Sequence, residues 1–148
     1  MPGTRRKGSA SNASAVLAVV GLLAAGLAGC GGSNGGQQDA RATDTAAVRN
    51  VLSQLQQASR AGDGDRICTQ IFTPKLADSV TRAANSGSCA EEVRANVFSP
   101  SARLTVEDVT VNDPANATAT VKEANGNRST VFLVKQSGRW RIRSVQPA

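Results

Sequence analysis

The residues of this chain that could do acid–base chemistry are carboxylates, because its 148 residues include no His and no Tyr. Histidine is the commonest general base and metal ligand, so its absence removes both roles, and no Ser–His pair can form. The acids Asp65, Glu107, Asp108 and Asp113 fall in predicted turns, caps or bulges, where solvent denies a carboxylate the basicity that catalysis needs. We therefore expect no catalytic residue, no metal and no cofactor.

Cys30 is the most informative of the three cysteines. It follows a basic stretch at residues 5–7 and an apolar run of 15 residues, Ala15 to Gly29, which is shorter than the roughly 20 residues of a membrane-spanning helix and fits a signal peptide. Leu27-Ala-Gly-Cys30 resembles the lipobox of bacterial lipoproteins, in which the cysteine becomes the N-terminus and takes diacylglycerol. The alternative, a buried cysteine at a helix end, is disfavoured by the glycines that follow.

This leader sets the expected domain organisation and location. We expect a lipoprotein signal peptide at residues 1–29, a flexible Gly-rich tether at 30–43 and one folded domain at 44–148. The mature protein would be anchored in the cell membrane, on its extracytoplasmic face, through Cys30.

Cys68 and Cys89 remain within the folded domain. Export places them in an oxidising compartment, and both lie on apolar stripes of neighbouring short helices, so we expect a disulfide between them. Two free buried thiols are the alternative. A zinc site would need more soft ligands than two thiols, and the spacing is far from that of a Cys-x-x-Cys redox pair.

The first half of the domain has the periodicity of helices. Apolar residues from Val48 to Ala58 recur every three or four positions, with Thr43 or Asp44 as N-cap and Gly62 as the stop. Further helices are indicated by the apolar stripe of residues 67–72, by Thr73-Pro74 as N-cap and first helical residue, and by Ser88-Cys-Ala-Glu91 as a capping box.

The second half has the alternation of β-strands. Four runs, at residues 104–111, 117–122, 129–135 and 140–145, are separated by short turn sequences that contain Asn, Asp, Pro or Gly. Short connections predict an antiparallel meander, and a change of phase in the first run predicts a bulge around Glu107-Asp108. Helices followed by a curved four-stranded meander make an α+β domain, with the helices on one side of the sheet.

Charge excludes a nucleic-acid-binding protein. Without the leader, 14 basic residues stand against 11 acidic ones, a net charge of only +3. The alternation of Arg139, Arg141 and Arg143 places three guanidinium groups on one face of the last strand. We expect a solvated outer face there, with contact to an anionic headgroup or the cell wall as the alternative.

The order of a long helix, the turn Ala61-Gly-Asp-Gly-Asp65, a Cys-bearing helix and a closing meander with Gly138-Arg-Trp-Arg-Ile142 resembles the nuclear-transport-factor-2-like domains of actinobacterial lipoproteins. The resemblance implies a cone-shaped half-barrel with the long helix in the concave sheet, often with a cavity at the wide end. Isomerases and cyclases of this fold use an Asp base with a Tyr or His, and this chain has neither of those partners.

Three functions remain open. The favoured one is a lipid-anchored binding module that holds an apolar small molecule in the cone or docks an envelope protein through the sheet. The alternatives are a small isomerase or cyclase with an unusual carboxylate site, and a structural homodimer. Trp140 is expected on the core face, either as an ordinary core anchor or as a contact for a ligand.

Overall fold

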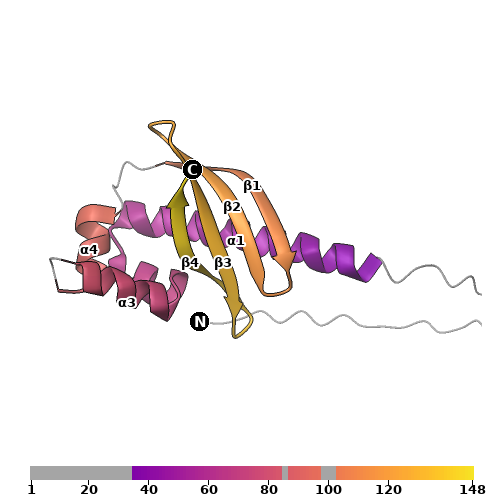
Figure 1. Ribbon diagram of the computed structural model, residues 1–148, viewed down its shortest axis with the longest axis horizontal. Coiled ribbons are helices and arrows are strands. Elements are labelled where there is room, and N and C mark those ends of the chain that lie inside the picture. The colour runs from indigo at the N-terminus through magenta and orange to yellow at the C-terminus, as the bar shows by residue number, and fades with distance from the viewer. Residues whose placement is uncertain (1–34, 85–86, 98–102) are drawn as a thin grey trace, which may run out of the picture. The chain divides into compact units, whose positions relative to one another are not determined.

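Figure 1 shows the computed structural model, which describes residues 35–84, 87–97 and 103–148. The predicted signal peptide, Cys30 and the start of the predicted tether lie outside these residues. The helical half comprises α1 (Gly35–Ala61), α2 (Gly64–Arg66), the π-helix η1 (Ile67–Ile71), α3 (Pro74–Ala83), α4 (Cys89–Glu92) and the π-helix η2 (Val93–Val97). The sheet comprises β1 (Leu104–Asp113), β2 (Asn116–Glu123), β3 (Arg128–Gln136) and β4 (Arg139–Pro147).

The four strands form one antiparallel sheet in the order β1-β2-β3-β4, which confirms the predicted meander and α+β class. The predicted bulge is also confirmed, because Val106 pairs with Val121 and Asp108 with Thr120, so Glu107 has no opposite residue in the register of β2. Two further irregularities were not predicted: the β1–β2 register passes from Val111 to Asp113 and leaves out Asn112, and the β3–β4 register passes from Ile142 to Ser144 and leaves out Arg143. Bulges increase the local twist of a sheet.

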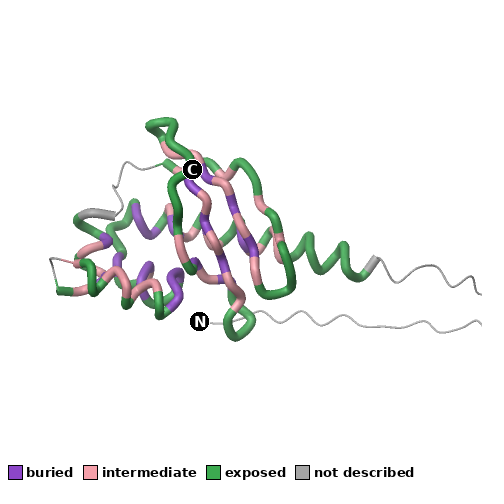
Figure 2. Tube along the Cα trace, in the orientation of Figure 1, coloured by how far each residue is buried: buried purple, intermediate pink, exposed green. Residues whose placement is uncertain are grey.

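The helix α1 crosses behind the strands in Figure 1 and packs on one face of the sheet, here called the inner face. Val48, Leu52, Leu55 and Ala58 of α1 are at most 2% exposed. The inner face supplies alternate residues of β2, β3 and β4, which are Ala117, Ala119, Val121, Val131, Leu133, Trp140 and Ile142. Figure 2 shows this burial concentrated where α1 and the central strands overlap. This arrangement is the one that the resemblance implies.

α1 begins earlier than the sequence predicts. Residues 35–43 are helical, so the prediction of a flexible tether over 30–43 is wrong for that part. Residues 36–43 are all exposed, and Gln37, Ala40 and Arg41 lie beside the end of β1. A helix already nucleated by the burial of Val48 and Leu52 extends at little cost through Gln, Ala and Arg, which are good helix formers. The predicted stop is correct, because α1 ends at Ala61 and Gly62 has a φ of 65°.

The other predicted helix starts are confirmed by their caps. The Thr73 side chain accepts a hydrogen bond from the Leu76 N–H, with Pro74 at the first helical position of α3. Ser88 accepts from the Glu91 N–H, as in a capping box, and its hydroxyl donates to the Glu91 carboxylate. Asp63 caps α2 in the same way, by accepting from the Arg66 N–H. Each cap satisfies N–H groups that have no partner within their own helix.

The predicted disulfide joins Cys68 of η1 to Cys89 of α4 across 21 residues of sequence, with the Cα atoms 6.2 Å apart. In the same region Gly64 packs closely against α4, because a Cβ at Gly64 would clash with the carbonyl of Ala90. Disulfide and close packing together fix η1 and α4 relative to each other.

Within residues 35–84, 87–97 and 103–148, no helix is both long and apolar enough to cross a membrane.

Replacing Cys68 and Cys89 together by Ala should lower the free energy of unfolding by about 3 kcal/mol, because the cross-link restricts a loop of about twenty residues in the unfolded chain. Urea unfolding followed by circular dichroism measures this loss. Reductant should destabilise the wild type by a similar amount and leave the double variant unchanged. Equal stability of wild type and double variant without reductant would contradict a stabilising bridge.

Candidate functional site

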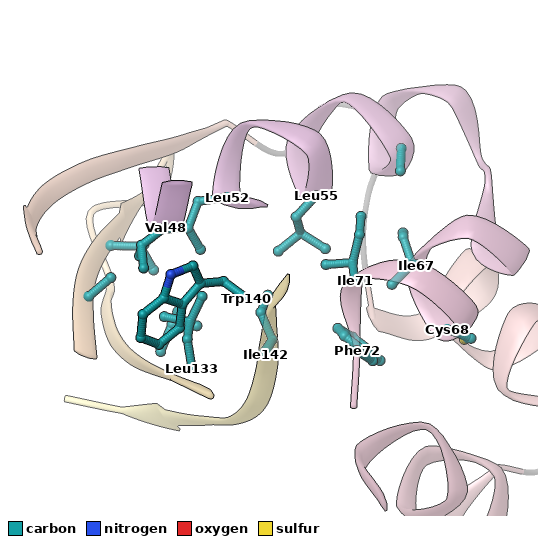
Figure 3. Close-up of a cluster of buried hydrophobic side chains, with 14 of the residues drawn as sticks. Val48, Leu52, Leu55, Ile67, Cys68, Ile71, Phe72, Leu133, Trp140 and Ile142 are labelled. Atoms are coloured by element: carbon teal, nitrogen blue, oxygen red, sulfur yellow. The ribbon is translucent and has the colours of Figure 1, made fainter. Parts of the chain in front are cut away.

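Trp140, the single Trp of the chain, lies at the boundary between the core and a surface cleft. It is 4% exposed, and Figure 3 draws its indole ring beside Val48 and Leu133. The sequence-based prediction that Trp140 lies on the core face is therefore confirmed. The ring is a core residue, and its edge also borders the cleft described below.

A charged pair holds the polar edge of this ring. The carboxylate atom Oδ1 of Asp44 accepts a hydrogen bond from Lys135 Nζ at 2.6 Å and a second one from Trp140 Nε1 at 3.1 Å. Lys135 Nζ also lies 5.6 Å from the centre of the indole ring, within the range of a cation–π contact. The Asp44 side chain is 15% exposed and that of Lys135 is 33% exposed. One carboxylate thus connects α1 to β3 and β4.

Sequence position explains why these side chains meet. Asp44 precedes Val48 by four residues and so lies on the stripe of α1 that faces the sheet. Lys135 follows Val131 and Leu133 at alternate positions of β3 and shares their inner face, opposite Trp140 in the register. The prediction that Thr43 or Asp44 caps the helix is wrong, because the helix begins nine residues before Asp44. Within α1 the Thr43 hydroxyl donates to the Asp39 carbonyl instead.

The environment of Asp44 keeps its carboxylate ionised. The hydrogen bond from Lys135 lowers the pKa of Asp44 below its ordinary value, and the Trp140 hydrogen bond and the charge of Lys135 act in the same direction. Burial opposes them by raising the pKa, with a smaller effect than that of the Lys135 hydrogen bond. A carboxylate with a lowered pKa is a weak general base, so Asp44 is suited to positioning Lys135 and Trp140.

The cleft beside Trp140, here called the Trp140 cleft, has a volume of about 250 Å³. It lies between α1, η1 and the β3–β4 turn. Its apolar lining comes from Ala47, Val51, Ile71 and Trp140, and its polar lining from Asn50, Gln54, Gln70 and Arg139, with Gly138 at the turn. Small-molecule sites combine an apolar wall with a few polar groups that fix the orientation of the ligand, and this lining has both components.

The polar groups of the Trp140 cleft are mostly uncommitted. Among the described residues, the side chains of Asn50, Gln70 and Arg139 form no hydrogen bond or ion pair with the protein. Gln54 accepts one long hydrogen bond, 3.5 Å, from Arg66. The side chains of Asn50, Gln70 and Arg139 therefore line the cleft without a protein partner. All three carry hydrogen-bond donors, and the two amides also carry an acceptor oxygen.

The three arginines of β4 do not share one environment, contrary to the prediction of a uniformly solvated face. Arg139 and Arg143 are exposed. Arg141 is half-buried, and its Nη1 donates to the carbonyls of Thr69 at 2.8 Å and Phe72 at 3.0 Å. Arg143 lies at the irregularity of the β3–β4 register, which interrupts the alternation of the strand. Arg141 thus fixes β4 to the end of η1.

The acids singled out in the sequence form local contacts and do not converge on one site. Asp65 pairs with Arg94, Glu107 pairs with Arg128, and Asp113 accepts from the N–H groups of Ala115 and Asn116 in its turn. The Arg128 hydrogen bond lowers the pKa of Glu107, and the Ala115 N–H does the same for Asp113. Asp108 accepts from the Thr110 hydroxyl. In the described part of the chain no three Cys, Asp or Glu residues are placed to hold a metal ion.

The interior of the domain is filled, and the outer face of the sheet is rich in Thr. Among the residues that the structure describes, seventeen buried apolar or cysteine residues fill the space between α1, the short helices and the sheet. The outer face carries Thr110, Thr118, Thr120 and Thr130 around a half-buried Phe132, so it is not a broad apolar surface. Of the described residues, Val145 is the one exposed large apolar side chain, at 47%.

Several residues of the site were not predicted from the sequence. Asn50 and Gln54 are four residues apart on one face of α1, a spacing that could have indicated a polar pair. Asp44 and Lys135 are charged residues at core-facing positions of a helix and a strand, which is a signal for a buried pair. Gln70 interrupts the apolar stripe of η1 and gave no clear signal.

Comparisons with known proteins bear on the fold. No protein-family model and no curated protein matches the chain. Among solved structures it is similar to the crystal structure of an NTF2-like protein of unknown function from Shewanella baltica OS155. The two share 20% sequence identity and a TM-score of 0.49, over 70% of this chain and 91% of the other. NTF2 stands for nuclear transport factor 2, and the function of that protein is itself unknown.

Replacing Asp44 by Asn should lower the free energy of unfolding at neutral pH by about 1–2 kcal/mol, because Lys135 loses its charged partner. The folded-state pKa of Asp44 lies below 3.8, so its contribution is complete above that pH and is lost as the pH falls through the lowered value. Urea unfolding from pH 2 to pH 7, followed by Trp140 fluorescence, measures the difference.

The matched control is Asp39→Asn, which removes the same charge from an exposed position of the same helix. It should change stability little at any pH. If the two variants had the same pH profile, the contribution assigned to the Asp44 pair would be absent.

Proposed function

We propose that the protein is a lipid-anchored extracytoplasmic binding protein that holds a small molecule in the Trp140 cleft. The observation that carries this proposal is the lining of the cleft, where the unpartnered side chains of Asn50, Gln70 and Arg139 surround an apolar wall formed in part by Trp140. All three side chains are exposed, so they are open to a ligand, and small-molecule sites use a few polar groups of this kind to fix the orientation of the ligand.

The size and lining of the cleft define the ligand further. Its volume of about 250 Å³ is below the common range of about 300–1,000 Å³ for drug-sized ligands, so the ligand is small. Asn50 and Gln70 each offer a donor and an acceptor, and the apolar wall accommodates a hydrocarbon portion. The expected apolar ligand is therefore refined to one that also forms hydrogen bonds.

Binding is favoured over catalysis by the state of the nearest acid. Asp44 is held by Lys135 and Trp140, its pKa is lowered, and it does not line the Trp140 cleft. An isomerase or cyclase needs a base whose pKa is tuned toward the working pH.

Docking of an envelope protein or of a second copy through the sheet is less favoured, because the described outer face is rich in Thr and has no broad apolar patch.

The proposed location rests on the sequence of the leader and on the disulfide. Leu27-Ala-Gly-Cys30 follows a basic and then an apolar segment, the order found in lipoprotein signal peptides. The bridge between Cys68 and Cys89 supports an oxidising compartment, since structural disulfides are rare in the cytosol. Acyl chains on one cysteine, each methylene contributing about 0.8 kcal/mol, would make a lasting anchor.

Replacing Cys30 by Ala should move the protein out of the acylated membrane fraction, because no thiol would remain to take diacylglycerol. Metabolic labelling with a palmitate analogue, followed by detergent phase partitioning, measures both acylation and membrane retention. Cys89→Ala is the matched control and should still be labelled. Labelling of the Cys30→Ala variant would contradict the proposed anchor.

Protein purified from its own envelope should carry a small molecule that native mass spectrometry detects as a mass increment. The Asn50→Leu/Gln70→Leu double variant should bind the isolated molecule at least about tenfold more weakly, because two ligand hydrogen bonds are lost. Quenching of Trp140 fluorescence measures the affinity.

Gln57→Leu is the control for this experiment. It replaces an exposed amide of α1 that does not line the Trp140 cleft. It should retain full affinity. If the double variant bound as tightly as the wild type, the ligand would lie elsewhere.

A further inference from the structure

A second hollow adjoins the Trp140 cleft and shares Arg139 with it. This hollow, here called the basic hollow, has a volume of about 440 Å³ and is lined by Pro74, Gln136, Ser137, Arg139 and Arg141. It is lined by residues of the β3–β4 turn, and this turn is at the lower end of the sheet in Figure 1. Arg139 therefore borders a cleft with an apolar wall on one side and a polar hollow on the other.

The basic hollow carries positive charge with no acid in its lining. Arg139 is exposed and has no ion pair among the described residues. Arg141 is fixed in place, because its Nη1 donates to the carbonyls of Thr69 and Phe72. A guanidinium group that is already immobilised loses less side-chain entropy when it binds an anion.

Local backbone geometry places further donors at the hollow. The β3–β4 turn has positive φ angles at Ser137, 49°, and Gly138, 76°, as in a two-residue hairpin turn, and Ser137 lines the hollow together with Gln136 and Arg139. Pro74, the first residue of α3, also lines the hollow. The positive end of the helix dipole of α3 adds to the field of the two arginines.

We infer that the basic hollow binds the carboxylate or phosphate group of a ligand whose less polar part lies in the Trp140 cleft. This inference rests on the proposed function and narrows it to an organic anion. Arg139 contacts the acidic group from the boundary between the two spaces. Arg141 adds a second positive charge behind it, and Asn50 and Gln70 bind the polar atoms of the ligand body.

Two probes of equal shape and different charge test this inference. Phenylacetate and phenylacetamide are titrated into the detergent-solubilised full-length protein, with Trp140 fluorescence as the readout. Phenylacetate should bind at least about fivefold more tightly than phenylacetamide at low salt, since charge-assisted hydrogen bonds are stronger than neutral ones. The preference should shrink as salt is added, because Arg139 is exposed.

Arginine variants identify the group responsible. Arg139→Gln should abolish the preference for phenylacetate, and Arg139→Lys should retain part of it. Arg143→Gln is the matched control, because Arg143 is exposed on the same strand and lines neither hollow. Circular dichroism establishes that each variant is folded. A preference that persisted in Arg139→Gln, or that Arg143→Gln removed equally, would overturn the inference.

The remaining outcomes separate this inference from the proposed function. Equal affinity for phenylacetate and phenylacetamide would overturn the anionic ligand and leave the binding function standing. Failure of both probes to bind would count against the inference and against the proposed function.

Glycerol 3-phosphate, the soluble form of an anionic lipid headgroup, should bind more weakly than phenylacetate because it lacks an apolar part. Tighter binding of glycerol 3-phosphate would overturn the two-part ligand and indicate a lipid headgroup.

Discussion

The contact between α1 and the inner face of the sheet is the interaction on which the other features depend. One helix supplies Val48, Leu52, Leu55 and Ala58 to a core that is completed by alternate residues of three strands and by the short helices. Moving this helix would expose much of the inner face of the sheet, because α1 runs behind the strands in Figure 1, and of the strands η1 packs chiefly against β4. The width of the Trp140 cleft follows from this contact, since one wall of the cleft is α1 and another is the β3–β4 turn.

The Asp44 pair matters more for position than for stability. Burying an ion pair gains little net free energy, because desolvation offsets most of the attraction between the charges. Here, however, the same carboxylate oxygen accepts from Lys135 and from Trp140, so the indole has a fixed orientation as well as a buried face. At the other side of the cleft, the disulfide of Cys68 and the Arg141 hydrogen bonds to Thr69 and Phe72 restrain η1, which carries Gln70. Both walls are thus held by polar or covalent links in addition to apolar packing.

The elements were predictable from the sequence wherever a local signal determined the structure. The caps at Thr73 and Ser88, the four strands, the bulge at Glu107 and the Cys68–Cys89 bridge all depend on residues near one another in sequence or on simple periodicity. The start of α1 was not predictable, because Gly35 and Gly36 disfavour helix while the buried half of the helix favours its extension. The site was harder to predict, since Asp44 and Lys135 are 91 residues apart and meet only through the packing of α1 on β3.

The filled core determines what kind of chemistry the cleft can perform. With Leu52, Leu133, Trp140 and Ile142 all buried, the space under α1 is occupied, and the Trp140 cleft lies at the margin of the domain, where its polar residues are open to water. An enzyme of general acid–base type gains from a dry site, in which a carboxylate has a raised pKa and charges interact strongly. This cleft has the opposite properties: its nearest carboxylate has a lowered pKa and its arginine is solvated. A cleft at the edge of the domain, with fixed walls and polar side chains that have no protein partner, is suited to reversible binding. A ligand could enter and leave it without disturbing the contact between α1 and the sheet.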